Sequence, residues 1–263
     1  MLPVEARSWI ATQRGDLAEV CALRSSQGEV WRVTLTDAAQ VAVKRASRAA
    51  IDRECWGLAL ARTMGSVPTL LSRPAPELVV LTWHDGVPSV GAQTVRLAGV
   101  WLRALHECEG TFCDPLPVPD AIGRRRDAWL ERARPHLSAP VRARLLETIE
   151  PGVFTGLKRT ACHRDFTPSN WLWSDALTVI DFGQARPDLP LWDLVKLEAE
   201  TFHEHPDLRS TFFEGYGSLD AQDEVRLGQL VLLHGLQTAV WGDSHGDAAF
   251  SSLGRQILER RLT

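Results

Sequence analysis

The sequence lacks the features that mark membrane, secreted and disulfide-stabilised proteins. No uncharged apolar run approaches the roughly 20 residues that a helix needs to cross a bilayer. The first residues, MLPVEARSWIATQR, mix acidic and basic side chains where a secretory signal would need an apolar core. The five cysteines are an odd number without paired spacing. These absences favour a cytoplasmic protein with reduced thiols and no membrane partner.

Lysine is also scarce, with three residues in 263, whereas arginine is abundant. The formal net charge of −4 argues against a nucleic-acid partner. The charge is uneven, however: residues 121–160 carry nine basic and four acidic side chains, and residues 198–247 carry ten acidic and two basic ones. Each segment alone is most simply a solvated helix face, and a surface that selects charged substrates is the alternative.

The first eighty-odd residues have the pattern of an antiparallel sheet. Five β-rich runs separated by short turns lie at residues 18–25, 29–37, 40–46, 67–72 and 77–83. Helical spacing of apolar residues covers 49–65, between the third and fourth runs, and Gly65 is the expected stop. This part of the chain therefore predicts a five-stranded sheet with one inserted helix.

The pattern changes to helix after about residue 92. Helical spacing covers six segments, at 94–107, 121–137, 140–150, 191–202, 223–242 and 251–262. Only a short strand pair, at 170–173 and 177–181, interrupts them. The predicted fold class is α+β and bilobal, with a small N-terminal sheet lobe at 1–86 and a larger, mostly helical C-terminal lobe at 87–263.

A lysine lies within the third apolar strand, in VAVKR. Lys44 shares a strand face with Ala42, and an ammonium on the inner side of a sheet needs an anionic partner. Glu54, in the following helix, is the natural candidate. Such a pair can hold an acidic ligand, usually phosphate, although a purely structural pair is equally consistent with these residues alone.

Three polar side chains follow in HRDFTPSNWLW and LTVIDFGQA. Phe166 can anchor the first loop in the core and Pro168 can stiffen it, so that Asp165 and Asn170 face one cavity. Carboxylate and amide oxygens, here from Asp181 and Asn170, are hard ligands suited to Mg²⁺. Asp165 then remains to accept a hydroxyl proton. Together with a lysine held by a glutamate, these are the working parts of phosphoryl transfer.

The motifs VAVK, HRDFTPSN and IDFG, in this order and spacing, resemble the signature of the protein-kinase superfold. The chain is most similar to the aminoglycoside phosphotransferase family, with its choline-kinase and antibiotic-kinase relatives. No APE follows DFG, and DFGQARPDLPLWDL runs directly into a helix without an activation segment. The resemblance covers the chain from about residue 15 to the end and implies a protein-kinase-like fold.

The resemblance implies a role for each matching residue. Asp165 is the expected catalytic base, Asn170 and Asp181 the Mg²⁺ ligands, and Lys44, positioned by Glu54, the contact for the α- and β-phosphates. The 1–86 lobe would bind ATP. Its phosphate loop would offer Ser25, Ser26 and Gly28, and its hinge at 82–86 would bind adenine through the backbone of Thr82 and His84.

The sequence departs from the family pattern at three places. The phosphate loop RSSQGEV has one glycine, residue 164 is Arg where members commonly carry Gly, and residue 182 is Phe where the family is variable. The leading hypothesis is an ATP- and Mg²⁺-dependent phosphotransferase with an alcohol group as acceptor, acting on an aminoglycoside-type antibiotic. An acidic stretch with Glu198, Glu200, Glu204, Asp243 and Asp247 could bind such a cationic small molecule.

Three alternatives stay open at this point. The same chemistry could act on a nucleoside or peptide antibiotic or on a metabolite. The Arg-rich helices at 121–150 suggest this alternative. A catalytically weak nucleotide-binding scaffold is disfavoured because Lys44, Glu54, Asp165, Asn170 and Asp181 are all present. A protein kinase is disfavoured because no peptide-docking activation segment is visible.

Overall fold

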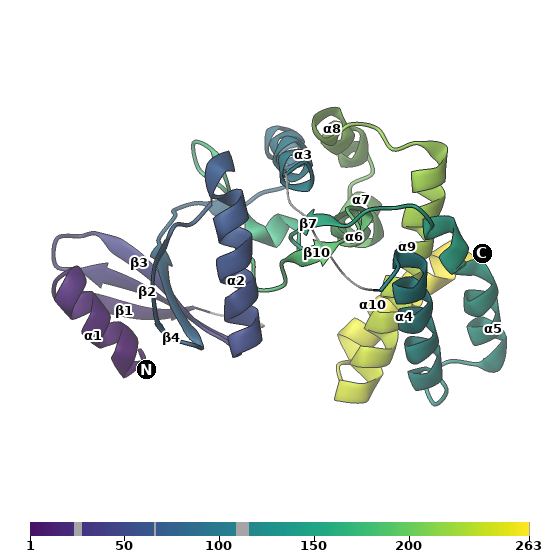
Figure 1. Cartoon of the computed structure of the whole chain (residues 1–263), viewed down its shortest axis with the longest axis horizontal. Coiled ribbons are helices and arrows are strands. Elements are labelled where there is room, and N and C mark those ends of the chain that lie inside the picture. The colour runs from purple at the N-terminus through teal and green to yellow at the C-terminus, as the bar shows by residue number, and fades with distance from the viewer. Residues whose placement is uncertain (24–27, 66, 109–115, 263) are drawn as a thin grey trace. The chain divides into compact units, whose positions relative to one another are not determined.

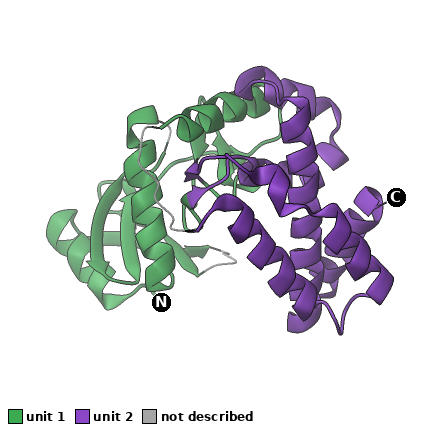
Figure 2. Cartoon of the chain, turned by 45° about the vertical axis from the view of Figure 1, so that its right-hand side comes forward, with its two compact units in different colours: residues 1–108, 163–186 green, residues 109–162, 187–263 purple. Residues whose placement is uncertain are grey.

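The computed structural model describes residues 1–23, 28–65, 67–108 and 116–262. The chain forms two compact units: residues 1–108 with 163–186, and residues 109–162 with 187–263 (Figure 2). The catalytic-loop segment from 163 onward thus belongs to the same unit as the N-terminal sheet. The predicted lobe boundary at residues 82–86 concerns a different division of the chain and stays a prediction.

The first unit contains the predicted five-stranded sheet (Figure 1). All neighbouring strands are antiparallel, in the order β1-β2-β3-β5-β4. Alternation in β2 buries Trp31, Val33 and Leu35 on one face. The strands are β1 (Leu17–Leu23), β2 (Glu29–Leu35), β3 (Gln40–Arg45), β4 (Leu70–Ala75) and β5 (Leu78–Thr82).

Two helices use opposite faces of this sheet. Helix α1 (Val4–Gln13) packs Ala6 and Ile10 into the cluster that contains Val41 and Val43 of β3. Successive strand residues point to opposite faces, so Lys44 points away from α1 and toward α2 (Arg48–Ala61). Helix α1 was not predicted, because its few buried residues form no clear apolar stripe.

Local sequence signals delimit α2. The Ser47 side chain accepts a hydrogen bond from the Ala50 amide at 3.3 Å and caps the first turn. A 3₁₀ turn, η1 (Arg62–Met64), follows the helix, and Gly65 ends it with a φ of +67°. The predicted stop at Gly65 is therefore confirmed.

The remainder of the first unit supports the catalytic-loop segment. It consists of β6 (Val87–Pro88), α3 (Ala92–His106), the 3₁₀ turn η3 (Pro168–Asn170), β8 (Trp171–Trp173) and β9 (Leu177–Val179), with the strands paired β6-β8-β9. Phe166 is 1% exposed and stacks on Trp101 of α3, with ring centroids 5.7 Å apart. The predicted anchoring of the loop by Phe166 is confirmed.

The second unit is mostly helical, which with the sheet of the first unit confirms the α+β class. Close packing of its two long helices requires glycine, because a Cβ at Gly254 would lie 2.2 Å from the Ala239 amide nitrogen. Within the described ranges no helix is both long and apolar enough to cross a membrane. The helices are α4 (Val118–Arg132), α5 (Ala139–Thr148), α6 (Leu191–Lys196), α7 (Phe202–Glu204), α8 (Asp207–Tyr216), α9 (Ala221–His245) and α10 (Ala248–Leu262).

Shorter elements complete this part of the chain. The 3₁₀ turn η2 (Pro151–Phe154) follows α5, and β7 (Thr160–Cys162) pairs with β10 (Arg186–Asp188). Between α6 and α7 the helix widens into a π-helical turn, η4 (Leu197–Thr201), a feature that the uninterrupted helix predicted at 191–202 did not include.

Candidate active site

A cavity of about 560 Å³ opens in the first unit, and all its lining residues belong to that unit. Its apolar walls include Val30, Ala42, Leu81, Leu172 and Ile180. A cavity of this size with apolar walls and a few polar groups is typical of a small-molecule or nucleotide site. Six of the residues predicted for the site line it: Lys44, Glu54, Thr82, His84, Asn170 and Asp181.

Lys44 lies between two carboxylates at one end of this cavity. Its Nζ donates to Glu54 Oε2 at 2.6 Å and to Asp181 Oδ1 at 2.5 Å. Lys44 and Glu54 are buried, at 7% and 1% exposure, whereas the Asp181 side chain is 29% exposed. The Glu54 partner was predicted, and the Asp181 partner was not.

The charges of this cluster shift its pKa values in opposite directions. Burial alone would lower the pKa of Lys44, but Glu54 and Asp181 outweigh burial and raise it above 10.5. Burial alone would likewise raise the pKa of Asp181, but the Lys44 ammonium outweighs it and holds that pKa below 3.8. At neutral pH Lys44 is therefore an ammonium and Asp181 a carboxylate.

His163 organises the loop that carries Asp165. The side chain is fully buried, its Nε2 lies 3.0 Å from the Ile180 carbonyl oxygen, and its Nδ1 accepts from the Asp165 amide at 3.3 Å. Because Nδ1 accepts, the ring proton lies on Nε2 and donates to Ile180. His163 thus links the loop to the residue before Asp181, a structural role.

Asn170 joins the loop to the cavity. Its Nδ2 donates to the Asp165 carbonyl oxygen at 2.8 Å and to Asp165 Oδ2 at 3.3 Å. The Ile180 amide donates to the Asn170 carbonyl oxygen at 3.1 Å, which brings residues 170 and 181 side by side. Asp165 itself is half-buried and contacts the cavity lining through Asn170.

The turn after Asp181 packs against α2. Gly57 of α2 faces Phe182 so closely that a Cβ at residue 57 would lie 2.7 Å from the Phe182 ring. One turn earlier, Arg53 Nε donates to the Gly183 carbonyl oxygen at 2.7 Å. Arg53 and Gly57 therefore fix the helix that carries Glu54. Sequence reasoning missed both, because a helical Arg or Gly gives no signal until its distant partner is known.

The donor set fits a magnesium ion and a nucleotide. With Asn170 Nδ2 directed at Asp165, the other amide atom, Oδ1, is the acceptor available to the cavity. Asp181 adds carboxylate oxygens at the same wall. Hard oxygens from one amide and one carboxylate suit Mg²⁺, which keeps further positions for phosphate oxygens and water.

The remaining predicted nucleotide contacts have different outcomes. Ser25 and Ser26 lie outside the described residues. Gly28 has a φ of +154°, and a Cβ there would lie 2.3 Å from the Arg45 carbonyl oxygen, so the close approach of β3 requires glycine. The Thr82 hydroxyl lies 3.1 Å from His84 Nε2, and burial lowers the pKa of His84 despite Asp85.

Several charged side chains of the second unit form ion pairs and hydrogen bonds within that unit. Glu198 pairs with Arg209 at 2.8 Å and with Arg261 at 3.0 Å, and Asp243 pairs with Arg255 at 2.7 Å. Asp247 accepts a hydrogen bond from the Phe250 amide at the start of α10. Glu200 lies 3.4 Å from His234 Nε2. Four of the five acids predicted for a cationic substrate thus have partners within the fold.

The Arg-rich helix α4 is engaged in a similar way. Arg126 donates to the Ile149 carbonyl oxygen at 2.9 Å, and Arg125 lies over the Trp192 ring at 4.8 Å. Arg124 is exposed. Most of the RRR motif at 124–126 therefore stabilises the second unit.

Solved structures of small-molecule kinases share this fold over nearly their whole length. The GDP and kanamycin complex of APH(2")-IIia has a TM-score of 0.74 at 17% identity, covering 98% of both chains. A putative fructosamine-3-kinase from Thermobifida fusca has a TM-score of 0.73 at 18% identity, covering 99% of both chains. Choline kinase LicA from Streptococcus pneumoniae has a TM-score of 0.72 at 17% identity, covering 98% of this chain and 97% of its own. These likenesses confirm the protein-kinase-like fold.

No curated protein matches the sequence. A family model described as the phosphotransferase enzyme family matches residues 19–228, which include every predicted catalytic and metal-binding residue. This match covers most of the chain and confirms the predicted enzyme class, a phosphotransferase with an alcohol group as acceptor. The chain belongs to the phosphotransferase enzyme family.

Proposed function

We propose that the protein transfers the γ-phosphoryl group of ATP to a hydroxyl group of a small molecule, with Asp165 as the base. The observation that carries this proposal is that Glu54, Lys44, Asp181 and Asn170 line one cavity, with Asp165 hydrogen-bonded to Asn170 at its edge. In the reaction, the acceptor oxygen forms a bond to the γ-phosphorus, the bond to the β-phosphate oxygen breaks, and ADP leaves. The hydroxyl proton passes to a carboxylate oxygen of Asp165.

The residues divide this work according to their charge. Glu54 and Asp181 hold the Lys44 ammonium at the cavity wall, where it can contact phosphate oxygens. Asn170 and Asp181 would hold Mg²⁺, which when bound neutralises phosphate charge. The Asn170 amide donor also orients Asp165 Oδ2. The backbone of Thr82 and His84 would bind adenine, and Ser25, Ser26 and Gly28 would cover the phosphates.

An aminoglycoside-type antibiotic is the proposed acceptor, which would make the protein a cytoplasmic resistance enzyme. The support is the likeness in fold to a structure that contains kanamycin. A second candidate is a less highly charged acceptor, such as a nucleoside or peptide antibiotic or a metabolite. It is favoured by the ion pairs of Glu198 and Asp243, which reduce the negative field available to a polycation.

An ADP-release assay with Mg·ATP tests the reaction and the acceptor together. The panel holds aminoglycoside, macrolide, peptide and nucleoside antibiotics, with choline as a metabolite. Turnover on aminoglycosides would support the first acceptor class, and turnover confined to weakly charged compounds would support the second. No ADP release above the acceptor-free rate on any hydroxyl compound, with ATP bound, would contradict the proposed activity on these classes.

Replacement of Asp165 by Ala tests its role as base. We expect kcat to fall by about 10²- to 10⁴-fold, the range for general base catalysis, with ATP affinity retained. Asp175 is exposed in the β8–β9 turn, so Asp175→Ala is the matched control and should retain full turnover. An Asp165→Ala variant with near-normal kcat would exclude this assignment.

A further inference from the structure

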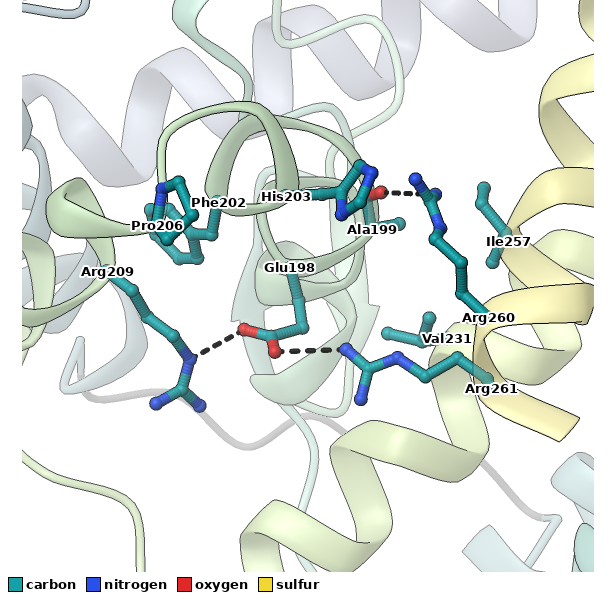
Figure 3. A pocket seen from close by; sticks show the side chains of 10 residues that line it. All are labelled: Glu198, Ala199, Phe202, His203, Pro206, Arg209, Val231, Ile257, Arg260 and Arg261. Carbon is teal, nitrogen blue, oxygen red and sulfur yellow. Dashed lines mark hydrogen bonds and ion pairs between the residues drawn. The ribbon is translucent and has the colours of Figure 1, made fainter. Parts of the chain in front are cut away.

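A second cavity, of about 320 Å³, lies within the second unit and contains none of the residues discussed as catalytic (Figure 3). Helical segments from η4 to α8, together with α9 and α10, form its walls. Phe202, Val231 and Ile257 give it an apolar side. Its polar side carries three guanidinium groups, from Arg209, Arg260 and Arg261, around the single carboxylate of Glu198.

Glu198 balances only part of this positive charge. Figure 3 shows its carboxylate between two guanidinium groups: Arg209 Nε donates to Oε2 at 2.8 Å and Arg261 Nη2 donates to Oε1 at 3.0 Å. Glu224 also accepts from Arg209, at 2.7 Å. Counting both carboxylates against the three arginines leaves a net charge of +1 at the cavity.

Arg260 supplies the excess charge. Its Nη2 donates to the Ala199 carbonyl oxygen at 3.1 Å, and among the described residues no carboxylate lies within ion-pair distance of it. This leaves the other guanidinium donors of Arg260 available, in the planar geometry that matches carboxylate and phosphate groups. In Figure 3 the His203 imidazole lies beside the Arg260–Ala199 contact.

An irregular backbone forms the wall opposite α10. Residues Leu197–Thr201 make a π-helical turn, and both Glu198 and Ala199 belong to it. Such turns are rare and occur often at functional sites, because the wider turn exposes carbonyl oxygens and re-aims side chains. Here the turn directs the Glu198 carboxylate and the Ala199 carbonyl oxygen toward the arginines of α8 and α10.

We propose that this cavity binds a small anion whose carboxylate or phosphate group is carried on an apolar body. The anionic group would meet Arg260 and Arg261, and the body would lie against Phe202, Val231 and Ile257. The volume admits a ligand about the size of one substituted ring. Binding at this site requires neither the nucleotide nor Asp165, so it is distinct from the proposed phosphoryl transfer.

Calorimetric titration of the full chain with benzoate and with phenyl phosphate, without nucleotide, tests the proposal. The two probes separate carboxylate from phosphate as the preferred group, and benzylamine serves as the cation of similar shape. We expect saturable binding of at least one anion and none of benzylamine. Equal binding of benzylamine, or no saturable binding of either anion, would overturn the proposal.

Two substitutions with opposite expected effects locate the site. Arg260→Gln should weaken anion binding by about tenfold or more, because a charge-assisted contact is lost. Glu198→Gln should tighten it by about tenfold, because a competing carboxylate is removed from Arg209 and Arg261. Arg134 pairs with Glu131 on an exposed surface, so Arg134→Gln is the control for overall charge.

The outcomes are decisive whether or not Glu198→Gln folds normally. Arg260 lies in the exposed last turn of α10, so its replacement leaves the cavity walls in place. Unchanged affinity in Arg260→Gln, or an equal loss in Arg134→Gln, would overturn the proposed site. A folded Glu198→Gln variant that binds the anion more weakly would do the same, because it would show that the carboxylate supports binding.

Discussion

The Lys44 ammonium is held in position by two carboxylates that differ in their exposure to the cavity. Glu54 is buried and fixes the ammonium from α2, whereas Asp181 is partly open to the cavity. Because Asp181 is also the proposed metal ligand, binding of Mg²⁺ would compete with Lys44 for its oxygens and direct the ammonium toward phosphate. The Lys44–Asp181 pair is thus a preformed site for a cation and an anion together.

Replacing Lys44 by Met should reverse the pH dependence contributed by Asp181. In the native protein the pKa of Asp181 lies below 3.8, so the stability it adds is fully present above pH 3.8 and is lost as pH falls through the folded pKa. Without Lys44, burial, the largest contribution to this pKa, should raise it above its unfolded value. The variant should then lose stability as pH rises from about 4 to 7.

Urea denaturation at pH 4.5 and pH 7 measures this effect. We expect the destabilisation caused by Lys44→Met to be larger at pH 7 than at pH 4.5. Lys158 is exposed, and Lys158→Met should show no such difference between the two pH values. A destabilisation by Lys44→Met that is equal at both values would show that Asp181 does not depend on Lys44 for its ionised state.

Substitutions at Arg164 would test whether the backbone of the catalytic loop is strained. Its φ is +66°, a left-handed conformation that costs a residue with a Cβ about 1 kcal/mol or more. Comparison of Arg164→Gly with Arg164→Ala removes the side-chain contacts from both variants. We expect the Gly variant to be more stable than the Ala variant by about 1 kcal/mol in urea denaturation, the opposite of the usual order.

A second left-handed residue provides the control for this comparison. Ala38 has a φ of +67° in the exposed β2–β3 turn, so Ala38→Gly should be stabilising by a similar amount without any effect on activity. If Ala38→Gly stabilises the protein and the two Arg164 variants are equally stable, the loop does not hold residue 164 in this conformation.

At the scale of elements, the close packing of α2 against the turn after Asp181 depends on Gly57. Any side chain at residue 57 would collide with Phe182, and the helix would have to move together with Glu54. We expect Gly57→Ala to cost about 1–3 kcal/mol of stability, as overpacked positions do, and to lower kcat by misplacing Lys44. Unfolding curves and the ADP-release assay measure the two effects.

Gly228 of α9 is the matched control for Gly57. It is helical too, but nothing lies within 4 Å of a Cβ built there. Gly228→Ala should therefore stabilise the protein by about 0.5–1 kcal/mol through helix propensity alone. A Gly57→Ala variant that behaves like Gly228→Ala would mean that α2 and the Asp181–Gly183 turn are not packed as tightly as described.

Elements with regular periodicity could be predicted from the sequence, and irregular ones could not. The five strands and α2 follow from alternating and helical patterns with clear turn residues. Helix α1 has a weak apolar stripe, because the sheet face that it covers needs only a few of its side chains. The π-helical turn at Leu197–Thr201 leaves no mark on the periodicity of a sequence, since the helix continues on both sides.

The candidate site divides in the same manner. Lys44, Asn170 and Asp181 could be predicted because each belongs to a motif whose spacing is specific in combination. Arg53 contacts Gly183, which lies 130 residues later in the sequence. No local sequence pattern predicts a contact over that separation. The acidic segment at 198–247 suggested a cation-binding surface. Counting charges along the chain cannot show that Glu198 and Asp243 form ion pairs with arginines.

At the scale of the whole molecule, the proposed nucleotide cavity draws on distant parts of one unit. Its lining comes mainly from β1, β2, β3, α2, the end of β5 with the segment that follows it, and the segment at 169–181. A ligand that contacts all of them stabilises only conformations in which they are together, so bound Mg·ATP should suppress local opening of these segments. This predicts a specific pattern of amide hydrogen exchange.

With Mg·ATP at about 100 times its Kd, exchange in residues 79–84 and 178–183 should slow by up to about 100-fold. Residues 227–240 of α9 belong to the other unit and do not line this cavity. Their amide exchange should therefore slow less. Chelation of Mg²⁺ should remove most of the protection, and so should Asp181→Asn, because both eliminate the metal link to phosphate. If the Asp181→Asn variant kept this protection, Asp181 would not be a metal ligand, because Mg·ATP would then bind without its carboxylate.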